Sequence, residues 1–180
     1  PFNFPFMIPL WSAPYAVATG NCVIIKPSPE VPISQMRLAE LVNEAGFPPG
    51  VWNVVNGGAS VGNELLEHPD IVGVTFVGST PTGKYIYSKC GQTGKRAIVQ
   101  TSAKNFMVIM PDCNVRATIP AMMTSFFGNT GQRCLSGANL LIVGNDEFYN
   151  SFLEGITNAA RRIVIGYGLD ESVQMGPVRD

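Results

Sequence analysis

Residues 51–83 read VWNVVNGGASVGNELLEHPDIVGVTFVGSTPTG, and this stretch decides the fold class. It contains two short apolar runs rich in β-branched residues, at 51–56 and 71–77, and a glycine follows each run. Between the two runs, residues 60–67 have helical spacing. Apolar strands that alternate with helices are typical of parallel sheets that are buried on both faces. We therefore predict an α/β fold with a doubly wound parallel sheet.

The same alternation continues on both sides of this stretch. A strand at 22–26 and a helix at 32–45 precede it, and strands at 96–100 and 105–110 follow it. The other expected elements are Ser60 as the N-cap of the helix at 60–67, a helix from Pro81 to Cys90, helices at 115–127 and 147–162, a glycine-rich segment at 128–137 and a strand at 140–144.

The domain organisation follows from a polar break at 101–104, which separates two predicted strands. We place a boundary there, so that 1–102 is part of one domain and 103–180 is part of a second α/β domain. The chain carries no initiating Met and opens inside an apolar motif, so we expect an excerpt of a longer protein.

Composition excludes two classes of partner. Hydrophobic residues make up 46% of the 180 residues and charged ones 14%, which is enough apolar material for a core. Twelve Lys and Arg against thirteen Asp and Glu leave no basic surplus to neutralise phosphates, so we expect no nucleic-acid partner. The longest apolar stretch, 4–18, is broken by Pro5, Pro9 and Pro14, so we expect no membrane span.

The four cysteines lie far apart in the sequence and form no CxxC pair. With His68 as the single histidine, this spacing excludes a zinc site, and we predict no metal. Free thiols indicate a reducing intracellular compartment, either the cytoplasm or the mitochondrial matrix. The cysteines are Cys22, Cys90, Cys113 and Cys134.

Residues 78–84 have the Gly-x4-Gly-Lys spacing of a phosphate-binding P-loop. Tyr85 stands where the magnesium-binding hydroxyl is needed, and Pro81 removes a backbone donor, so a nucleotide triphosphatase is disfavoured. Gly78 and Ser79 still end a strand at a helix N-terminus, where N–H groups and a hydroxyl can hold an anion. An ordinary strand–turn–helix cap explains the same residues equally well.

Lys26 and Cys134 can also carry chemistry. Lys26 ends a predicted strand at the sheet edge where open α/β folds bind ligands, although a solvated surface lysine fits too. Cys134 follows Arg133 in a loop of small residues, which can hold a thiolate in an electropositive environment. An inert, small apolar cysteine is the alternative, and His68 offers no Cys–His pair.

Taken together, five ordered motifs resemble the aldehyde dehydrogenase superfamily. The resemblance covers essentially the whole chain. Phe2 before Asn3, the run KRAIVQTSAKNFMVIMPD at 95–112 and GQRC resemble the methylmalonate-semialdehyde dehydrogenase branch, which is NAD-dependent and makes acyl-CoA. The motifs are PFNFP at 1–5, KPSPEVP at 26–32, GFPPGVWNVVNG at 46–57, TFVGSTPTG at 75–83 and GQRC at 131–134.

The resemblance implies a reaction for the second domain. Cys134 would attack the carbonyl carbon of a small aldehyde and form a thiohemiacetal. The side-chain amide of Asn3, with the Cys134 N–H, would stabilise the oxyanion. Hydride transfer to NAD would leave a thioester on Cys134, and Arg133 would pair with a substrate carboxylate.

The resemblance also implies coenzyme contacts in residues 1–102. Lys26 would hold the adenosine ribose, the Gly78–Ser79 turn would hold the pyrophosphate, and Phe2 would line the coenzyme cleft. Pro29 stands where the family has a ribose-binding Glu, and Glu30 would replace it if the loop shifts.

Two further departures concern the product. Val99 stands at the position that we align with the general-base Glu of hydrolytic relatives, and Thr101–Ser102 replace the usual Gly-Gly. Without that base, water is a poor acceptor of the acyl group, so we expect coenzyme A as co-substrate and an acyl-CoA product.

Two alternatives stay open. The first is a hydrolytic aldehyde dehydrogenase that gives a free acid and takes its base from residues outside this chain. The second is a noncatalytic NAD-binding or structural protein of the same fold, which Pro29 and Thr101–Ser102 favour. The family's nicotinamide-ribose Glu and its oligomerisation hairpin would lie beyond Asp180. We therefore expect this excerpt to be inactive alone and the full-length protein to be a homo-oligomer.

Overall fold

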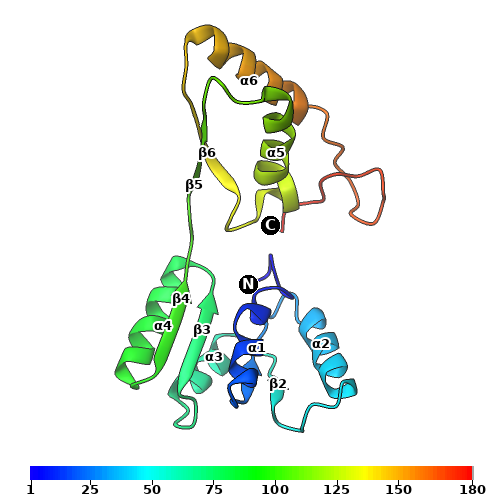
Figure 1. Cartoon of the computed structure of the whole chain (residues 1–180). Coiled ribbons are helices and arrows are strands. Elements are labelled where there is room, and N and C mark those ends of the chain that lie inside the picture. The colour runs from blue at the N-terminus through cyan, green and yellow to red at the C-terminus, as the bar shows by residue number, and fades with distance from the viewer. Residues whose placement is uncertain (180) are drawn as a thin grey trace. The chain divides into compact units, whose positions relative to one another are not determined.

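The computed structural model describes residues 1–179 of the chain. The chain folds as two compact units, Pro1–Ser102 and Ala103–Asp180 (Figure 1). The sequence also predicts a boundary between Ser102 and Ala103. The functions predicted for the two parts stay predictions.

The first unit is built on parallel strand–helix–strand segments. Its elements are η1 (Pro9–Trp11), α1 (Ala13–Ala18), β1 (Val23–Ile25), α2 (Ile33–Glu44), β2 (Trp52–Val54), α3 (Ala59–Glu67), β3 (Gly73–Val77), α4 (Thr80–Gln92) and β4 (Arg96–Gln100). β1 pairs in parallel with β2, and β3 pairs in parallel with β4. A helix connects the strands of each pair, as parallel pairing requires, because a short turn cannot return the chain to the start of a parallel strand.

Helix α4 packs closely on β4 because the contact point is a glycine. A Cβ atom at Gly83 would collide with the side chain of Thr101 and lie 3.0 Å from Cγ1 of Val99. Cys90, on the same helix, is completely buried, and burial raises the pKa of its thiol. This cysteine therefore behaves as a small apolar core residue with an inert thiol.

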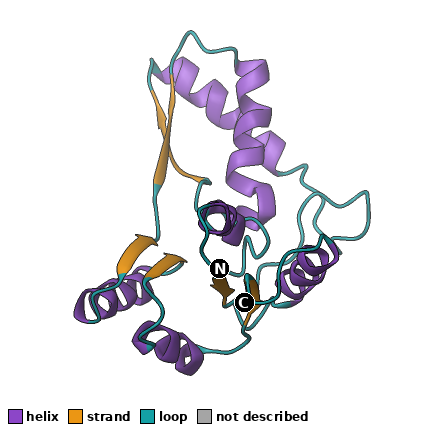
Figure 2. Ribbon diagram, turned by 60° about the horizontal axis from the view of Figure 1, so that its bottom comes forward, coloured by secondary structure: helices purple, strands orange, loops and turns teal. Residues whose placement is uncertain are grey.

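The second unit is a smaller parallel α/β arrangement. Its elements are β5 (Asn105–Ile109), α5 (Val115–Phe127), η2 (Gly128–Gly131), β6 (Gly137–Ile142) and α6 (Asp146–Ala160). β5 pairs in parallel with β6, and both helices lie on one side of this pair (Figure 2). The core on that side is centred on Ile109, Met122 and Phe152.

The predicted α/β class is confirmed, and every described strand pair is parallel. The described strands form three separate two-stranded sheets rather than one continuous doubly wound sheet. Two local predictions are wrong. Ser60 is not an N-cap, since α3 begins at Ala59 with Gly58 as its N-cap. β6 begins at Gly137 rather than at residue 140, because Gly137 already pairs with Asn105 in the ladder.

The sequence pattern does not predict η1 and α1, two short helices near the start of the chain. Both have a proline at N1 or N2, where the missing N–H costs nothing, so prolines that interrupt an apolar stretch of sequence stand at helix starts here. Among the helices of residues 1–179, none has the length and apolar character needed to cross a bilayer.

Candidate active site

Cys134 lies in a tight turn between η2 and β6. The N–H of Ser136 donates to the carbonyl of Arg133 at 3.1 Å, which closes a β-turn with Cys134 and Leu135 at its centre. Cys134 is half-buried, and the neighbouring Leu135 is 72% exposed. We call residues 133–136 the nucleophile turn, after the role that the sequence motifs predict for Cys134. A thiol at this position is partly accessible, as a reactive cysteine must be.

The segment before this turn has an unusual backbone. Asn129 and Thr130 have φ angles of 53° and 57°, and Gly131 follows at 70°, so three successive residues are left-handed. The conformation costs a residue with a side chain about 1–2 kcal/mol. Gln132 N–H closes the segment by donating to the Asn129 carbonyl at 2.9 Å. Strain of this kind is concentrated at functional sites, so it supports a functional role for this loop.

Arg133 folds back onto the loop that precedes it. A Cβ atom at Gly128 would lie 2.8–2.9 Å from the guanidinium atoms, so a larger residue there would require the Arg133 side chain to move. Nε of Arg133 is buried and has no hydrogen-bond partner among residues 1–179. The predicted pairing of Arg133 with a substrate carboxylate stays a prediction.

Lys26 lies directly after β1 and is held by carbonyl groups. Its Nζ donates to the carbonyls of Pro27 and Gly57, at 3.0 and 3.1 Å. Its side chain also reaches α3, since a Cβ at Gly62 would lie 4.0 Å from Lys26 Cε. Burial lowers the pKa of Lys26. An ammonium group has three donors, so one N–H of Lys26 is available to a ligand at this strand end.

The Gly78–Ser79 turn joins β3 to α4. Gly78 lies against the ring of Phe76, which leaves no room for a Cβ atom. Ser79 is the N-cap of α4, but its side chain makes no capping bond and donates instead to the Thr82 hydroxyl at 2.9 Å. The first-turn N–H groups of α4 therefore have no side-chain cap, which suits an anion at this helix end.

Phe2 and Asn3 are half-buried and belong to a segment that Gln35 anchors. Gln35 is completely buried in α2, and its Nε2 donates to the Pro5 carbonyl at 2.6 Å. The sequence analysis missed Gln35, because a single polar residue in a helical pattern gives no sign that it is buried. Glu30 is exposed.

The end of β4 holds no carboxylate. Val99 packs toward Gly83 of α4, and the next residue, Gln100, is exposed. Successive side chains of a strand point to opposite faces, so Val99 and Gln100 lie on the two faces of the end of β4. Neither side chain can act as a general base.

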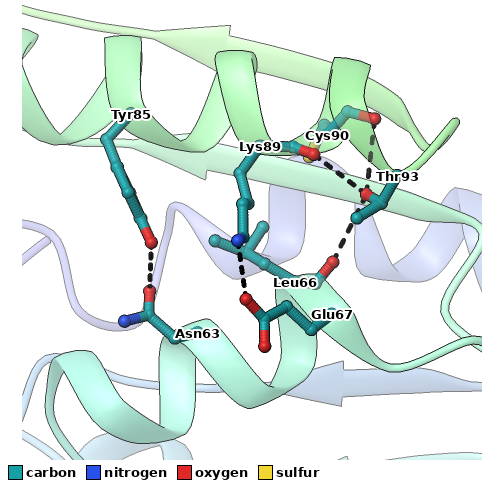
Figure 3. Close-up of polar contacts among 7 residues, drawn as sticks. All are labelled: Asn63, Leu66, Glu67, Tyr85, Lys89, Cys90 and Thr93. Carbon is teal, nitrogen blue, oxygen red and sulfur yellow. Dashed lines mark hydrogen bonds and ion pairs between the residues drawn. The ribbon is translucent and has the colours of Figure 1, made fainter.

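Side-chain contacts join α3 to α4 (Figure 3). Tyr85 donates to Asn63 Oδ1 at 3.0 Å, and Lys89 pairs with Glu67 at 2.6 Å. The hydrogen bond and charge of Glu67 raise the pKa of Lys89. The Tyr85 hydroxyl thus holds two helices together, which further disfavours the P-loop interpretation. No cluster of three or more metal-binding side chains exists among the described residues.

The aldehyde dehydrogenase family model matches residues 1–180. The chain belongs to the aldehyde dehydrogenase family. The resemblance seen in the sequence motifs is thus confirmed.

Relatives in this family agree on a narrower group. Malonate-semialdehyde dehydrogenase 1 of Geobacillus thermodenitrificans is 44% identical over 178 residues, and the Lacticaseibacillus casei malonate-semialdehyde dehydrogenase is 45% identical. Each match covers 99% of this chain and 36% of the relative, so the chain spans about a third of their length.

Solved structures of aldehyde dehydrogenases have the same fold. A Sinorhizobium meliloti protein, assigned as a methylmalonate-semialdehyde dehydrogenase and crystallised with NAD, gives a TM-score of 0.95 at 43% identity. The methylmalonate-semialdehyde dehydrogenase of Oceanimonas doudoroffii gives 0.95 at 38% identity. Each match covers 99% of this chain and 36% of the other.

Proposed function

We propose that the complete enzyme oxidises a semialdehyde with NAD and transfers the acyl group to coenzyme A. The observation that carries this proposal is the nucleophile turn, which offers a half-buried thiol beside a strained loop in a chain of this family. The relatives are named for malonate and methylmalonate semialdehydes, whose carboxylate would suit Arg133.

The residues present fit NAD. The first-turn N–H groups of α4 carry no side-chain cap, Gly78 keeps the approach free of a Cβ, and Lys26 has an N–H to spare. Bound NAD supplies the hydride acceptor. Lys26 would hold the adenosine ribose and Ser79 the pyrophosphate, while Phe2 would line the cleft and Glu30 would reach the ribose.

In the proposed reaction, the Cys134 thiolate attacks the carbonyl carbon of the aldehyde. The new C–S bond forms while the π electrons move to oxygen, and the Asn3 amide and the Cys134 N–H donate to that oxyanion. When the oxyanion collapses, its carbon loses hydride and becomes a thioester on Cys134. Donors fixed at an oxyanion lower such barriers by about 3–4 kcal/mol.

The end of β4 favours coenzyme A over water for the second half of the reaction. Hydrolysis of the thioester needs a general base, worth about 10²–10⁴-fold, and Val99 and Gln100 cannot serve. The thiol of coenzyme A has a pKa near that of free cysteine, about 8.5, so a few per cent is thiolate at pH 7. Attack by this thiolate releases acyl-CoA and regenerates the Cys134 thiolate.

The test follows NADH and the product made by the complete enzyme from malonate or methylmalonate semialdehyde, with and without coenzyme A. We expect steady turnover and an acyl-CoA product only when coenzyme A is present. Equally fast turnover without coenzyme A, with a free acid as product, would identify the hydrolytic alternative. No NADH under either condition would favour the noncatalytic alternative.

A further inference from the structure

Asn105, the first residue of β5, binds the nucleophile turn from the side. Its Nδ2 donates to the carbonyls of Cys134 and Ser136, at 2.7 and 2.9 Å. Both protons of the amide are therefore used. We propose that Asn105 is a positioning residue, which fixes the Cys134 peptide so that the thiol keeps the orientation needed for attack. This inference rests on the proposed function, because it takes Cys134 as the nucleophile.

The strand pairing places Asn105 beside the turn. Asn105 pairs with Gly137, whereas Phe106 pairs with Asn139, so the register shifts by one residue at Ala138. A β-bulge of this kind bends the strand and re-aims side chains, and bulges are frequent next to active sites. The irregularity thus lies where β5 begins and where the chain leaves the turn to enter β6.

Helix α5 also holds the turn. Ser136 Oγ donates to the Ser125 carbonyl at 2.5 Å, and Gly137 N–H donates to Ser125 Oγ at 3.0 Å. A Cβ atom at Gly137 would lie 2.5 Å from the Phe126 ring and 2.9 Å from the Met107 sulfur. Ser136 and Gly137 are therefore fixed by α5 and by close packing as well as by Asn105, whereas Asn105 is the residue that holds the Cys134 carbonyl.

A positioning role has a clear kinetic consequence. A displacement of about 1 Å at the reacting atoms can cost about 10²-fold in rate. Loss of the Asn105 bonds releases the Cys134 carbonyl while the Ser125 bonds remain. Loss of the Asn105 bonds should therefore slow the attack by Cys134, while the affinity for coenzyme and the stability of the second unit change little.

The chain offers a matched control in the first unit. Asn53 Nδ2 also donates to two carbonyls, those of Val23 and Gly50, at 3.1 and 2.7 Å. The same substitution at Asn53 removes an equivalent pair of bonds from the β1–β2 region. Asn53→Asp therefore shows the effect of losing two amide–carbonyl hydrogen bonds elsewhere in the protein. A larger effect of Asn105→Asp then comes from the position of Asn105 beside Cys134.

The experiment compares Asn105→Asp, Asn53→Asp and Cys134→Ser with the parent in the complete enzyme. An aspartate has nearly the same shape but turns a carboxylate oxygen toward the two carbonyls. We expect Asn105→Asp to slow the pre-steady-state NADH burst and the alkylation of Cys134 by iodoacetamide, the burst by about 10²-fold. The thermal shift that NAD gives Asn105→Asp should stay within twofold of the parent's shift. The burst rate constant of Asn53→Asp should stay within threefold of the parent's.

Asn105→Ser, which keeps one donor on a shorter side chain, should slow the burst by about tenfold, and it decides the matter if Asn105→Asp does not fold. The proposal is wrong if the variants at Asn105 keep the parent's burst rate constant, if only the burst amplitude falls, or if Asn53→Asp slows the burst equally. If Cys134→Ser gives an NADH burst as fast and as large as the parent's, the proposed function is wrong instead.

Discussion

The candidate coenzyme residues and the nucleophile turn are built in different ways. Lys26 and Ser79 lie where regular strands end, and each side chain bonds within the first unit. Cys134 lies in an irregular turn that follows three left-handed residues. Asn105, 29 positions away in the sequence, holds this turn. The proposed coenzyme contacts thus depend on regular strand–helix geometry, whereas the position of the proposed nucleophile depends on long-range side-chain bonds.

The largest effect should come from the thiol itself. Cys134→Ser should lower the rate constant of the NADH burst by more than about 10³-fold, because in the proposed reaction no other group forms the thioester. Cys113→Ser is the control, since Cys113 is also a half-buried thiol of the second unit. Stopped-flow measurement on the complete enzyme gives both rates. Equal rates for the two variants would remove the distinction between the nucleophile turn and the rest of the unit.

The oxyanion donor should come next. Asn3→Ala should lower kcat by about 10²–10³-fold, because a fixed donor acts on charge that exists only in the transition state. The same variant should bind NAD as the parent does. Steady-state kinetics and thermal shifts with NAD check the two parts, and a rise in KM with unchanged kcat would assign Asn3 to substrate binding instead.

The coenzyme side should respond to pH through Lys26. Burial lowers the pKa of Lys26 below its ordinary 10.5, so the ammonium is lost at a lower pH than in an exposed lysine. Stabilisation by NAD should therefore be full at neutral pH and decline as the pH rises through this lowered pKa. At neutral pH, NAD should stabilise Lys26→Met less than it stabilises the parent. The stabilisation of this variant should also not decline as the pH rises through the pKa of Lys26. Identical pH profiles for parent and variant would exclude Lys26 from the coenzyme site.

The partly buried Lys26 ammonium also affects the stability of the free protein. Because burial disfavours the charged form, this effect costs folding free energy at pH values below the lowered pKa. The cost disappears as the pH rises from that pKa toward the unfolded value. Thermal unfolding without NAD, across the alkaline range, measures this contribution separately from binding.

The smallest effect should come from the contacts between α3 and α4. Tyr85→Phe removes one partly exposed hydrogen bond to Asn63 and should lower the free energy of unfolding by about 0.5 kcal/mol. Affinity for NAD should stay unchanged. Chemical denaturation and a coenzyme titration check the two statements. Binding of magnesium–ATP to the parent would revive the P-loop interpretation.

The sequence predicts the regular elements well because their signals are local. β4 and α5 have the predicted bounds, and Gly78 and Ser79 lie at the predicted strand end. Apolar periodicity and the glycines that follow the strands carry this information. The α/β fold class and the parallel pairing follow from the same alternation of strands and helices.

The missed features depend on partners that are distant in the sequence. Gln35 and Asn105 hold the segments of Asn3 and Cys134 through carbonyl groups about 30 residues away. No spacing rule identifies such a pair. The start of β6 at Gly137 was missed for a similar reason, because pairing with β5, not the propensity of glycine, makes this residue a strand residue.

The most direct test of Cys134 as the nucleophile is to trap the acyl group on the protein. The complete enzyme is incubated with malonate or methylmalonate semialdehyde and NAD without coenzyme A, then digested and examined by mass spectrometry. We expect an acyl thioester on the peptide that contains Cys134, formed with one equivalent of NADH and removed when coenzyme A is added. An acyl group on another cysteine, or one equivalent of NADH with no acyl group on Cys134, would contradict it.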